Sequence, residues 1–173
     1  MPVFVTFRAN VSRDTCIPEI EIEEQFDAYH AALRAEQQRL GAPNGAIIID
    51  AVGQPEIRIE DELDYWIYNL CFDALPDLLA GARVERVYSR YSQSLVLDAT
   101  GHDLVLSGDA IPTVHLDLKE AVQSLYACGM RGLRFLKRLN EGTVYAGDFD
   151  PISRRAEAVR RELDSTFLDA TTP

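Results

Sequence analysis

The sequence predicts an α+β domain in which a mostly antiparallel sheet carries helices packed on it. Apolar residues recur at helical spacing towards both ends of the chain, whereas short β-branched and alternating stretches fill the middle. Connections between successive strands are short, which suits hairpins and leaves little room for parallel crossovers. With 173 residues, 47% of them hydrophobic and 26% charged, the chain has the size and composition of one globular domain. We expect a single two-layer domain over residues 1–168 and a frayed tail over 169–173.

The first part of the chain is expected to form a strand, a helix and a hairpin. Residues 2–8 are rich in β-branched and aromatic side chains, which is typical of a strand. From Ile22 to Leu40, apolar residues fall at helical spacing, which predicts one amphipathic helix. Residues 46–50 and 56–60 flank a turn that contains Gly and Pro, so they are expected to pair. The first arm is continuously apolar and therefore central, and the second alternates and therefore has one face in water.

The strongest helical pattern follows this hairpin. Asp61 is the expected N-cap, because its carboxylate can accept the orphan amide N–H groups of the first turn. Pro76 removes one backbone donor, so the helix is expected to kink or restart near Leu75. The apolar stripe, which we expect to be buried, consists of Leu63, Trp66, Ile67, Leu70, Cys71, Ala74, Leu75 and Leu78.

The second half of the chain predicts an antiparallel meander and two long helices. A Gly-containing turn separates two of the β-rich stretches, which is the signature of a hairpin. The expected strands cover 84–91, 94–99, 104–107 and a last short stretch over 114–118, and the expected helices cover 119–139 and 151–168.

The apolar segments, the cysteines and the motifs of the sequence indicate where the protein is located, the state of its thiols and whether it binds a cofactor. No stretch approaches the ~18 apolar residues of a membrane span, and residues 1–3 do not begin a basic and then apolar signal segment. We therefore expect a cytoplasmic protein. Cys16, Cys71 and Cys128 are odd in number, far apart and in no Cys-x-x-Cys pair, so buried or half-buried free thiols are expected. No phosphate loop, dinucleotide fingerprint or zinc motif is present, and no cofactor is predicted.

Acidity is concentrated in the first half of the chain. Residues 1–81 hold 5 Lys and Arg against 15 Asp and Glu, a net charge of −10, whereas residues 82–173 hold 12 against 13, a net of −1. Together these make the −11 of the whole chain. Such a field repels phosphate backbones and anionic lipid, and it attracts cationic protein surfaces. We therefore expect a basic protein partner, no nucleic acid and no membrane.

The candidate contact surface consists of two acidic runs, around Glu19 to Asp27 and from Glu56 onward, and a line of aromatic residues that ends at Phe72. Tyr65, Tyr68 and Phe72 lie off the main apolar stripe of their helix, and Glu62 and Asp64 beside them are expected to be exposed. Tyr supplies contact area at low entropic cost, and carboxylates steer a basic partner. The alternative is a helix buried on two sides, with its hydroxyl groups hydrogen-bonded inside. The predicted partner-binding residues are Glu23, Glu24, Asp27, Glu60, Asp61, Glu62, Asp64, Tyr65 and Tyr68.

Two other kinds of site have weaker support. His115 and Asp117 lie two apart on a predicted strand and share a face, and imidazole with carboxylate can ligate a divalent ion; the wider group adds Asp98, His102, Asp103 and Asp109. We favour the alternative, a polar turn in which Asp and Gly supply turn geometry and Asp117 caps the next helix. His30 is expected on a helix flank. Basic residues over 131–138 could contact phosphate, but cations at a helix C-terminus are also what the helix dipole favours.

The middle of the chain resembles a known class of protein. Residues 66–79 (Trp-Ile-Tyr-Asn-Leu-Cys-Phe-Asp-Ala-Leu-Pro-Asp-Leu-Leu) precede the strands over 94–107, and the helix with residues 129–136 (Gly-Met-Arg-Gly-Leu-Arg-Phe-Leu) follows. In order and size, residues 60–140 are similar to small bacterial immunity proteins, which neutralise toxins delivered between competing cells. The resemblance rests on pattern, and no residue role is carried across. It implies a cytoplasmic, non-enzymatic inhibitor of one cognate toxin domain.

Three functions therefore remain open at this stage. The favoured one is an acidic inhibitor that binds a basic toxin domain, because it alone uses the charge asymmetry. The second is a metal-assisted enzyme that uses the region from Asp98 to Asp117. The third is a structural or oligomer-forming module, and a homodimer is compatible with all three.

Overall fold

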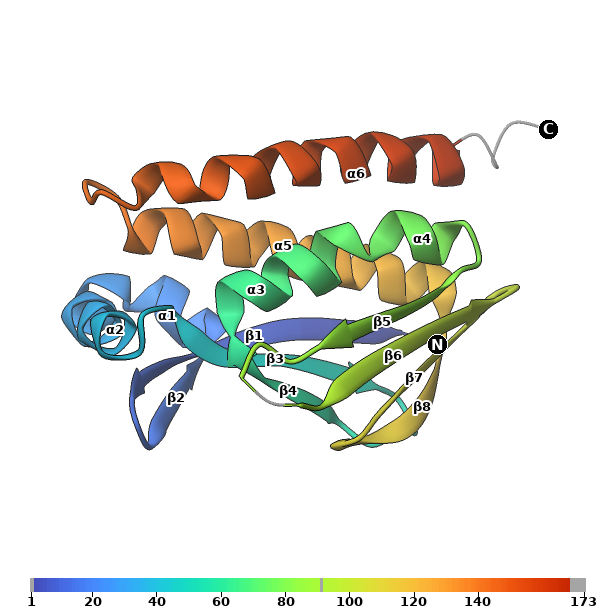
Figure 1. Cartoon of the computed structure of the whole chain (residues 1–173), viewed down its shortest axis with the longest axis horizontal. Coiled ribbons are helices and arrows are strands. Elements are labelled where there is room, and N and C mark those ends of the chain that lie inside the picture. The colour runs from blue at the N-terminus through green and yellow to red at the C-terminus, as the bar shows by residue number, and fades with distance from the viewer. Residues whose placement is uncertain (1, 91, 169–173) are drawn as a thin grey trace.

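The computed structural model describes residues 2–90 and 92–168, in which helices and two antiparallel sheets pack into an α+β fold (Figure 1). Buried side chains from both sheets and from the helices form one hydrophobic core. The predicted fold class is confirmed, but the strands form two four-stranded sheets rather than one. The expected tail over 169–173 lies outside the described residues. The helical segments are α1 (Glu19–Glu24), α2 (Phe26–Leu40), α3 (Leu63–Tyr68), η1 (Asn69–Asp73), α4 (Leu75–Leu79), α5 (Leu118–Leu139), η2 (Ala146–Phe149) and α6 (Asp150–Leu168).

The first sheet has the strand order β2-β1-β3-β4, with all neighbours antiparallel. The predicted hairpin is confirmed as the β3–β4 pair, and β1 is longer than the sequence indicated. Strand β2 was not predicted, because its four residues are too few to show a period. The strands are β1 (Val3–Ser12), β2 (Thr15–Pro18), β3 (Asn44–Ala51) and β4 (Ile57–Glu62).

Two helices replace the single helix predicted between β2 and β3. The chain leaves helical geometry at Gln25, whose φ is −128° and ψ is 30°. This break lets Ile22 of α1 and Phe26 of α2 both reach the core. The second helix ends where Gly41 adopts a φ of 85°, a conformation that glycine takes without steric cost.

The apolar stripe after β4 is confirmed, since each of its eight residues is at most 1% exposed. The predicted restart near Leu75 is also confirmed, because α4 begins there with Pro76 in its first turn. The predicted cap is wrong. Asp61 lies in β4, and α3 follows Glu62 without a side-chain cap. A π-helical turn, η1, separates α3 from α4, and it turns Leu70, Cys71 and Phe72 into the interior.

The predicted meander is confirmed as the second sheet, with the order β5-β6-β7-β8. The helical segments α3, η1 and α4 lie between β4 and β5 in place of a tight turn, so β5 does not continue from β4 as a hairpin. The strands are β5 (Arg83–Val87), β6 (Ser94–Thr100), β7 (Asp103–Gly108) and β8 (Ile111–Asp117).

Helix α5 is the centre of the helical layer, and it packs on the first sheet and on the α3–η1 segment. The Asp117 side chain accepts a hydrogen bond from the Glu120 N–H at 2.9 Å and caps this helix, as the sequence analysis favoured. Gly129 and Gly132 allow the close approach, because a Cβ on Gly132 would lie 2.4 Å from Ile67 Cδ1 and one on Gly129 would lie 2.6 Å from Cys71 Cβ. The two predicted long helices, α5 and α6, are confirmed.

Candidate functional site

The nine predicted partner-binding residues lie in two places. Glu23, Glu24 and Asp27 are on α1 and α2, and the other six belong to the end of β4 and to α3. We call the first group, with Ile20, the α1 ridge and the second group, residues 60–68, the β4–α3 corner. The two groups differ in how many of their carboxylates already form hydrogen bonds or ion pairs within the protein.

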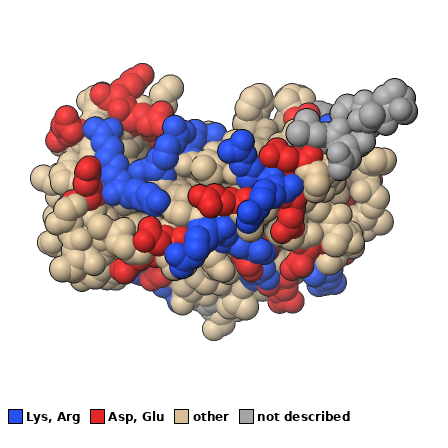
Figure 2. Space-filling model, turned by 90° about the horizontal axis from the view of Figure 1, so that it is seen from above, with Lys and Arg blue, Asp and Glu red and all other residues tan. Residues whose placement is uncertain are grey.

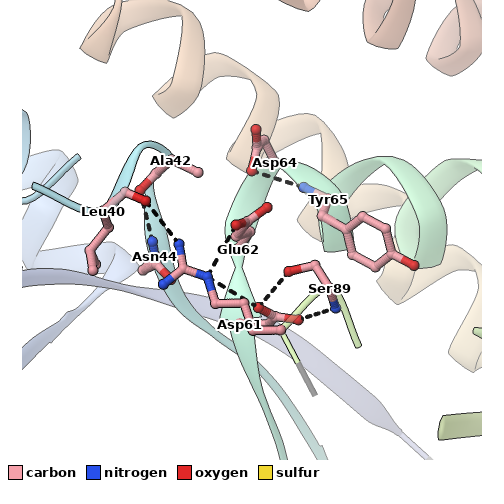
Figure 3. Close-up of polar contacts among 9 residues, drawn as sticks. Leu40, Ala42, Asn44, Asp61, Glu62, Asp64, Tyr65 and Ser89 are labelled. Carbon is pink, nitrogen blue, oxygen red and sulfur yellow. Dashed lines mark hydrogen bonds and ion pairs between the residues drawn. The ribbon is translucent and has the colours of Figure 1, made fainter. Parts of the chain in front are cut away.

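Asp61 holds the β4–α3 corner to the loop after β5. It is 5% exposed, and its carboxylate accepts the Ser89 N–H at 2.6 Å and the Ser89 hydroxyl at 2.7 Å (Figure 3). Hydrogen bonds to a charged group are stronger than neutral ones, so this contact fixes the loop that links β5 to β6. A carboxylate buried in this way is not a surface for a partner, which corrects the prediction for Asp61.

Arg90 neutralises much of the remaining charge at this corner. Its Nε lies 3.1 Å from Glu62 Oε1 and 3.9 Å from Asp61 Oδ1, and its Nη2 donates to the Leu40 carbonyl at 3.2 Å. Glu60, which is exposed, pairs with Arg58 on the same strand. Glu62 is half-buried, so the prediction that it is exposed is wrong. Arg90 from the β5–β6 loop and Arg58 from β4 itself therefore cancel part of the field of these acids locally.

Asp64 points away from this group, as Figure 3 shows, and lines a separate cleft of about 340 Å³. It is half-buried rather than exposed, and one carboxylate oxygen accepts the Tyr65 N–H at 3.0 Å. Burial raises the pKa of Asp64, and the nearby Glu62 adds to the rise, whereas Arg90 opposes it. Pro43, Asp148 and Phe149 line other walls of the cleft.

The tyrosines of α3 match the interior alternative in part, because both are half-buried but the hydrogen bond of the Tyr65 hydroxyl is exposed. The Tyr65 hydroxyl donates to the Val87 carbonyl at 2.7 Å, and its ring meets Trp66 edge-on with centroids 5.4 Å apart. Burial raises the pKa of Tyr65. Tyr68 is half-buried against the core and Phe72 is fully buried. This helix is therefore covered on two sides.

The α1 ridge is different, because its charges face outward. Glu23, Glu24 and Asp27 are exposed. Asp27 lies 3.4 Å from Arg138 Nη2, but its side chain stays 97% exposed. In the part of the chain that the structure describes, Glu23 and Glu24 have no ion-pair partner within 4.0 Å. The carboxylates of Glu23 and Glu24 are therefore exposed and make no direct ion pair with the described residues, although Arg131, Arg134 and Arg138 line the same hollow as Glu23.

Ile20 is the residue of the ridge that the sequence analysis missed. It is 67% exposed, whereas Ile22 is 2% exposed. The signal was present, because residues two apart on a helix point to nearly opposite sides and cannot both be buried by one sheet. Phe4 on β1 is also exposed, at 60%. Ile20 is therefore an exposed apolar side chain on the same short helix as the exposed carboxylates of Glu23 and Glu24.

One acid of the same run is structural. Glu19 is 7% exposed, forms an ion pair with Arg131 and accepts the Phe7 N–H at 3.4 Å. Arg131 also donates to the Val5 carbonyl at 2.7 Å. This pair fastens α1 to β1 and α5, so the ridge has a fixed base.

The group considered for metal binding is dispersed over β6, β7, β8 and their turns. Asp109 accepts the Ser94 N–H at 2.9 Å, Asp117 caps α5, and the Asp98 partners across the sheet are Arg83 and Val105. His30, His102 and His115 are exposed. Within residues 2–90 and 92–168, no group of three or more His, Cys, Asp or Glu side chains is arranged to hold a metal ion.

Comparisons with known proteins add no family to this description. No protein-family model, curated protein or solved structure matches the chain. None of the described helices is both long and apolar enough to cross a membrane.

Proposed function

We propose that this chain is a cytoplasmic, non-enzymatic inhibitor that captures one basic toxin domain, in the manner of the small bacterial immunity proteins that its middle segment resembles. The α1 ridge is the contact surface. The observation that carries the proposal is the combination on one short helix of exposed Ile20 with the carboxylates of Glu23 and Glu24, which have no ion-pair partner within 4.0 Å among the described residues. Apolar anchors supply interface energy, and unpaired charges nearby set the association rate and the specificity.

The β4–α3 corner has a supporting role in this proposal. Its acids are engaged by Ser89, Arg90 and Arg58, so a partner would have to break these contacts to use them. Glu60, which stays exposed, can add to the attraction. The metal-assisted enzyme is not favoured by any particular observation in the described residues.

The test is a pull-down of this chain with the C-terminal domain encoded by a neighbouring toxin gene, followed by binding kinetics at increasing salt. We expect a stoichiometric complex whose association slows as salt rises while its dissociation changes less. The double variant Glu23→Lys with Glu24→Lys should slow association by at least about tenfold, because it reverses the charge of the ridge.

A matched control separates the ridge from net charge. Asp50→Lys with Glu56→Lys makes the same change in net charge at exposed positions flanking the β3–β4 turn, and it should slow association much less. Equal effects of the two double variants would remove the ridge as the contact. The absence of any complex with the wild-type chain would sink the inhibitor function.

A further inference from the structure

A groove between α5 and α6 has the opposite character to the α1 ridge. It holds about 320 Å³, and its floor includes Met130 and the buried Leu133. Arg134, Lys137 and Arg160 line its rim and are exposed. Figure 2 shows Lys and Arg side chains over the helical face of the molecule, with Asp and Glu side chains among them. The groove is therefore apolar inside and cationic at its edge.

The rim charges of this groove are largely free. Arg160 lies 3.7 Å from Asp164 within α6, where both side chains are mostly exposed. Such surface pairs hold their charges weakly. For Arg134 and Lys137, the described residues include no carboxylate within 4.0 Å. Glu157 is the acid that shares the groove lining, so the rim keeps an excess of positive charge.

The ridge and the groove are neighbours on one side of the molecule. Arg134 lines the α5–α6 groove and also a second hollow of about 240 Å³, which Glu23 lines from α1. An acidic ridge with an exposed isoleucine thus lies next to a basic groove with an apolar floor. Two such neighbouring, complementary surfaces satisfy each other when a second copy is related by a two-fold axis that passes between them.

We propose that two copies of this chain form a symmetric dimer in which the α1 ridge of each copy docks in the α5–α6 groove of the other. Ile20 enters the apolar floor, and Glu23 and Glu24 face Arg134 and Lys137 of the second copy. This is a helix-in-groove contact whose specificity comes from charge complementarity. It uses the ridge that the proposed function assigns to the toxin, so its test contains no toxin, and its failure leaves the proposed function standing.

The test is analytical ultracentrifugation of the full chain at low, moderate and high salt. Two chains of net charge −11 repel each other most strongly at low salt. We therefore expect the wild type to dimerise at moderate salt, which screens this long-range repulsion, and to dissociate at high salt, which weakens the ion pairs of the contact. Glu23→Lys with Glu24→Lys, and separately Arg134→Glu with Lys137→Glu, should each raise the dimer dissociation constant roughly tenfold or more. Thermal melting confirms that each variant is folded.

The decisive arm mixes the two charge-reversed variants. In a mixed dimer the reversed ridge of one chain meets the reversed groove of the other, and the two unaltered surfaces also meet, so the mixture should regain the wild-type dissociation constant. Ile20→Ser should weaken the dimer without changing its salt slope, because it removes only apolar contact. A wild type that stays monomeric at all three salt concentrations, or a mixture no tighter than its components, overturns the dimer.

Discussion

The α1 ridge and the β4–α3 corner are both acidic in sequence, but they differ in how the structure uses their carboxylates. Each is a run of acids with few bases nearby, yet the ridge presents Glu23 and Glu24 to water while the corner buries Asp61 and pairs Glu62 with Arg90. The difference lies in what the fold brings alongside. The β5–β6 loop supplies Ser89 and Arg90 to the corner, whereas α5 supplies Arg131 to Glu19 at the base of the ridge and Arg138 to the exposed Asp27. An acidic run therefore keeps its charge available to a partner only where the fold leaves its carboxylates unpaired.

The first way to test this contrast is to remove the anchor of the corner. Trp66 is 1% exposed and meets Tyr65 and Tyr88 edge-on. Trp66→Ala should lower the free energy of unfolding by ~3–5 kcal/mol, as other large-to-small core changes do. Denaturant titration measures this. An unchanged midpoint would mean that α3 does not pack as described.

A smaller loss is expected when the buried carboxylate is removed. Asp61→Ala should cost roughly 2–3 kcal/mol, because two donors of Ser89 lose a charged acceptor. Ser89→Ala should cost less, since the backbone N–H of residue 89 keeps its partner. A double-mutant cycle between these positions measures the coupling. If the two losses simply add, the hydroxyl of Ser89 contributes nothing to the contact that holds the loop.

The third prediction concerns the pH dependence of Asp64. Burial raises the pKa of its folded-state carboxyl, so the folded chain binds this proton more tightly than the unfolded chain. Ionising Asp64 therefore lowers stability as pH rises from the unfolded value, about 3.9, through the raised pKa.

Asp64→Asn removes this ionisation and keeps an oxygen acceptor for the Tyr65 N–H. The stability of the variant relative to the wild type should increase as pH rises through that window, and the difference should stay constant at higher pH. Melting temperatures across the pH range measure this, with Asp50→Asn at an exposed position as the control. An advantage that grows as pH falls would contradict the assignment.

The smallest effect is expected at the ridge. Glu23→Lys and Glu24→Lys should each change the free energy of unfolding by no more than about 0.5 kcal/mol, because both side chains are exposed and unpaired among the described residues. Chemical denaturation of the single variants tests this. A loss of unfolding free energy as large as that expected for Asp61→Ala would show that the carboxylates of the ridge, like those of the corner, stabilise the fold.

Patterns of neighbouring residues determined much of this protein from the sequence alone. The apolar stripe from Leu63 to Leu78, the β3–β4 hairpin, the meander and the helices α5 and α6 all follow from periods of 3.6 or 2 that local backbone geometry imposes. The cap of α5 by Asp117 was likewise within reach, because a cap bonds an amide only three residues away.

Only the tertiary structure decided which charges are free. Asp61 meets Ser89, Glu62 meets Arg90 and Glu19 meets Arg131 across separations of 28, 28 and 112 residues. The separation into two sheets and the break at Gln25 also depend on how distant elements cover the core. Periodicity shows which face of an element is apolar, but ion pairing depends on atoms brought together from distant parts of the chain. The excess of acidic residues in the first half could therefore be counted from the sequence, whereas the exposure of the α1 ridge could be seen only in the structure.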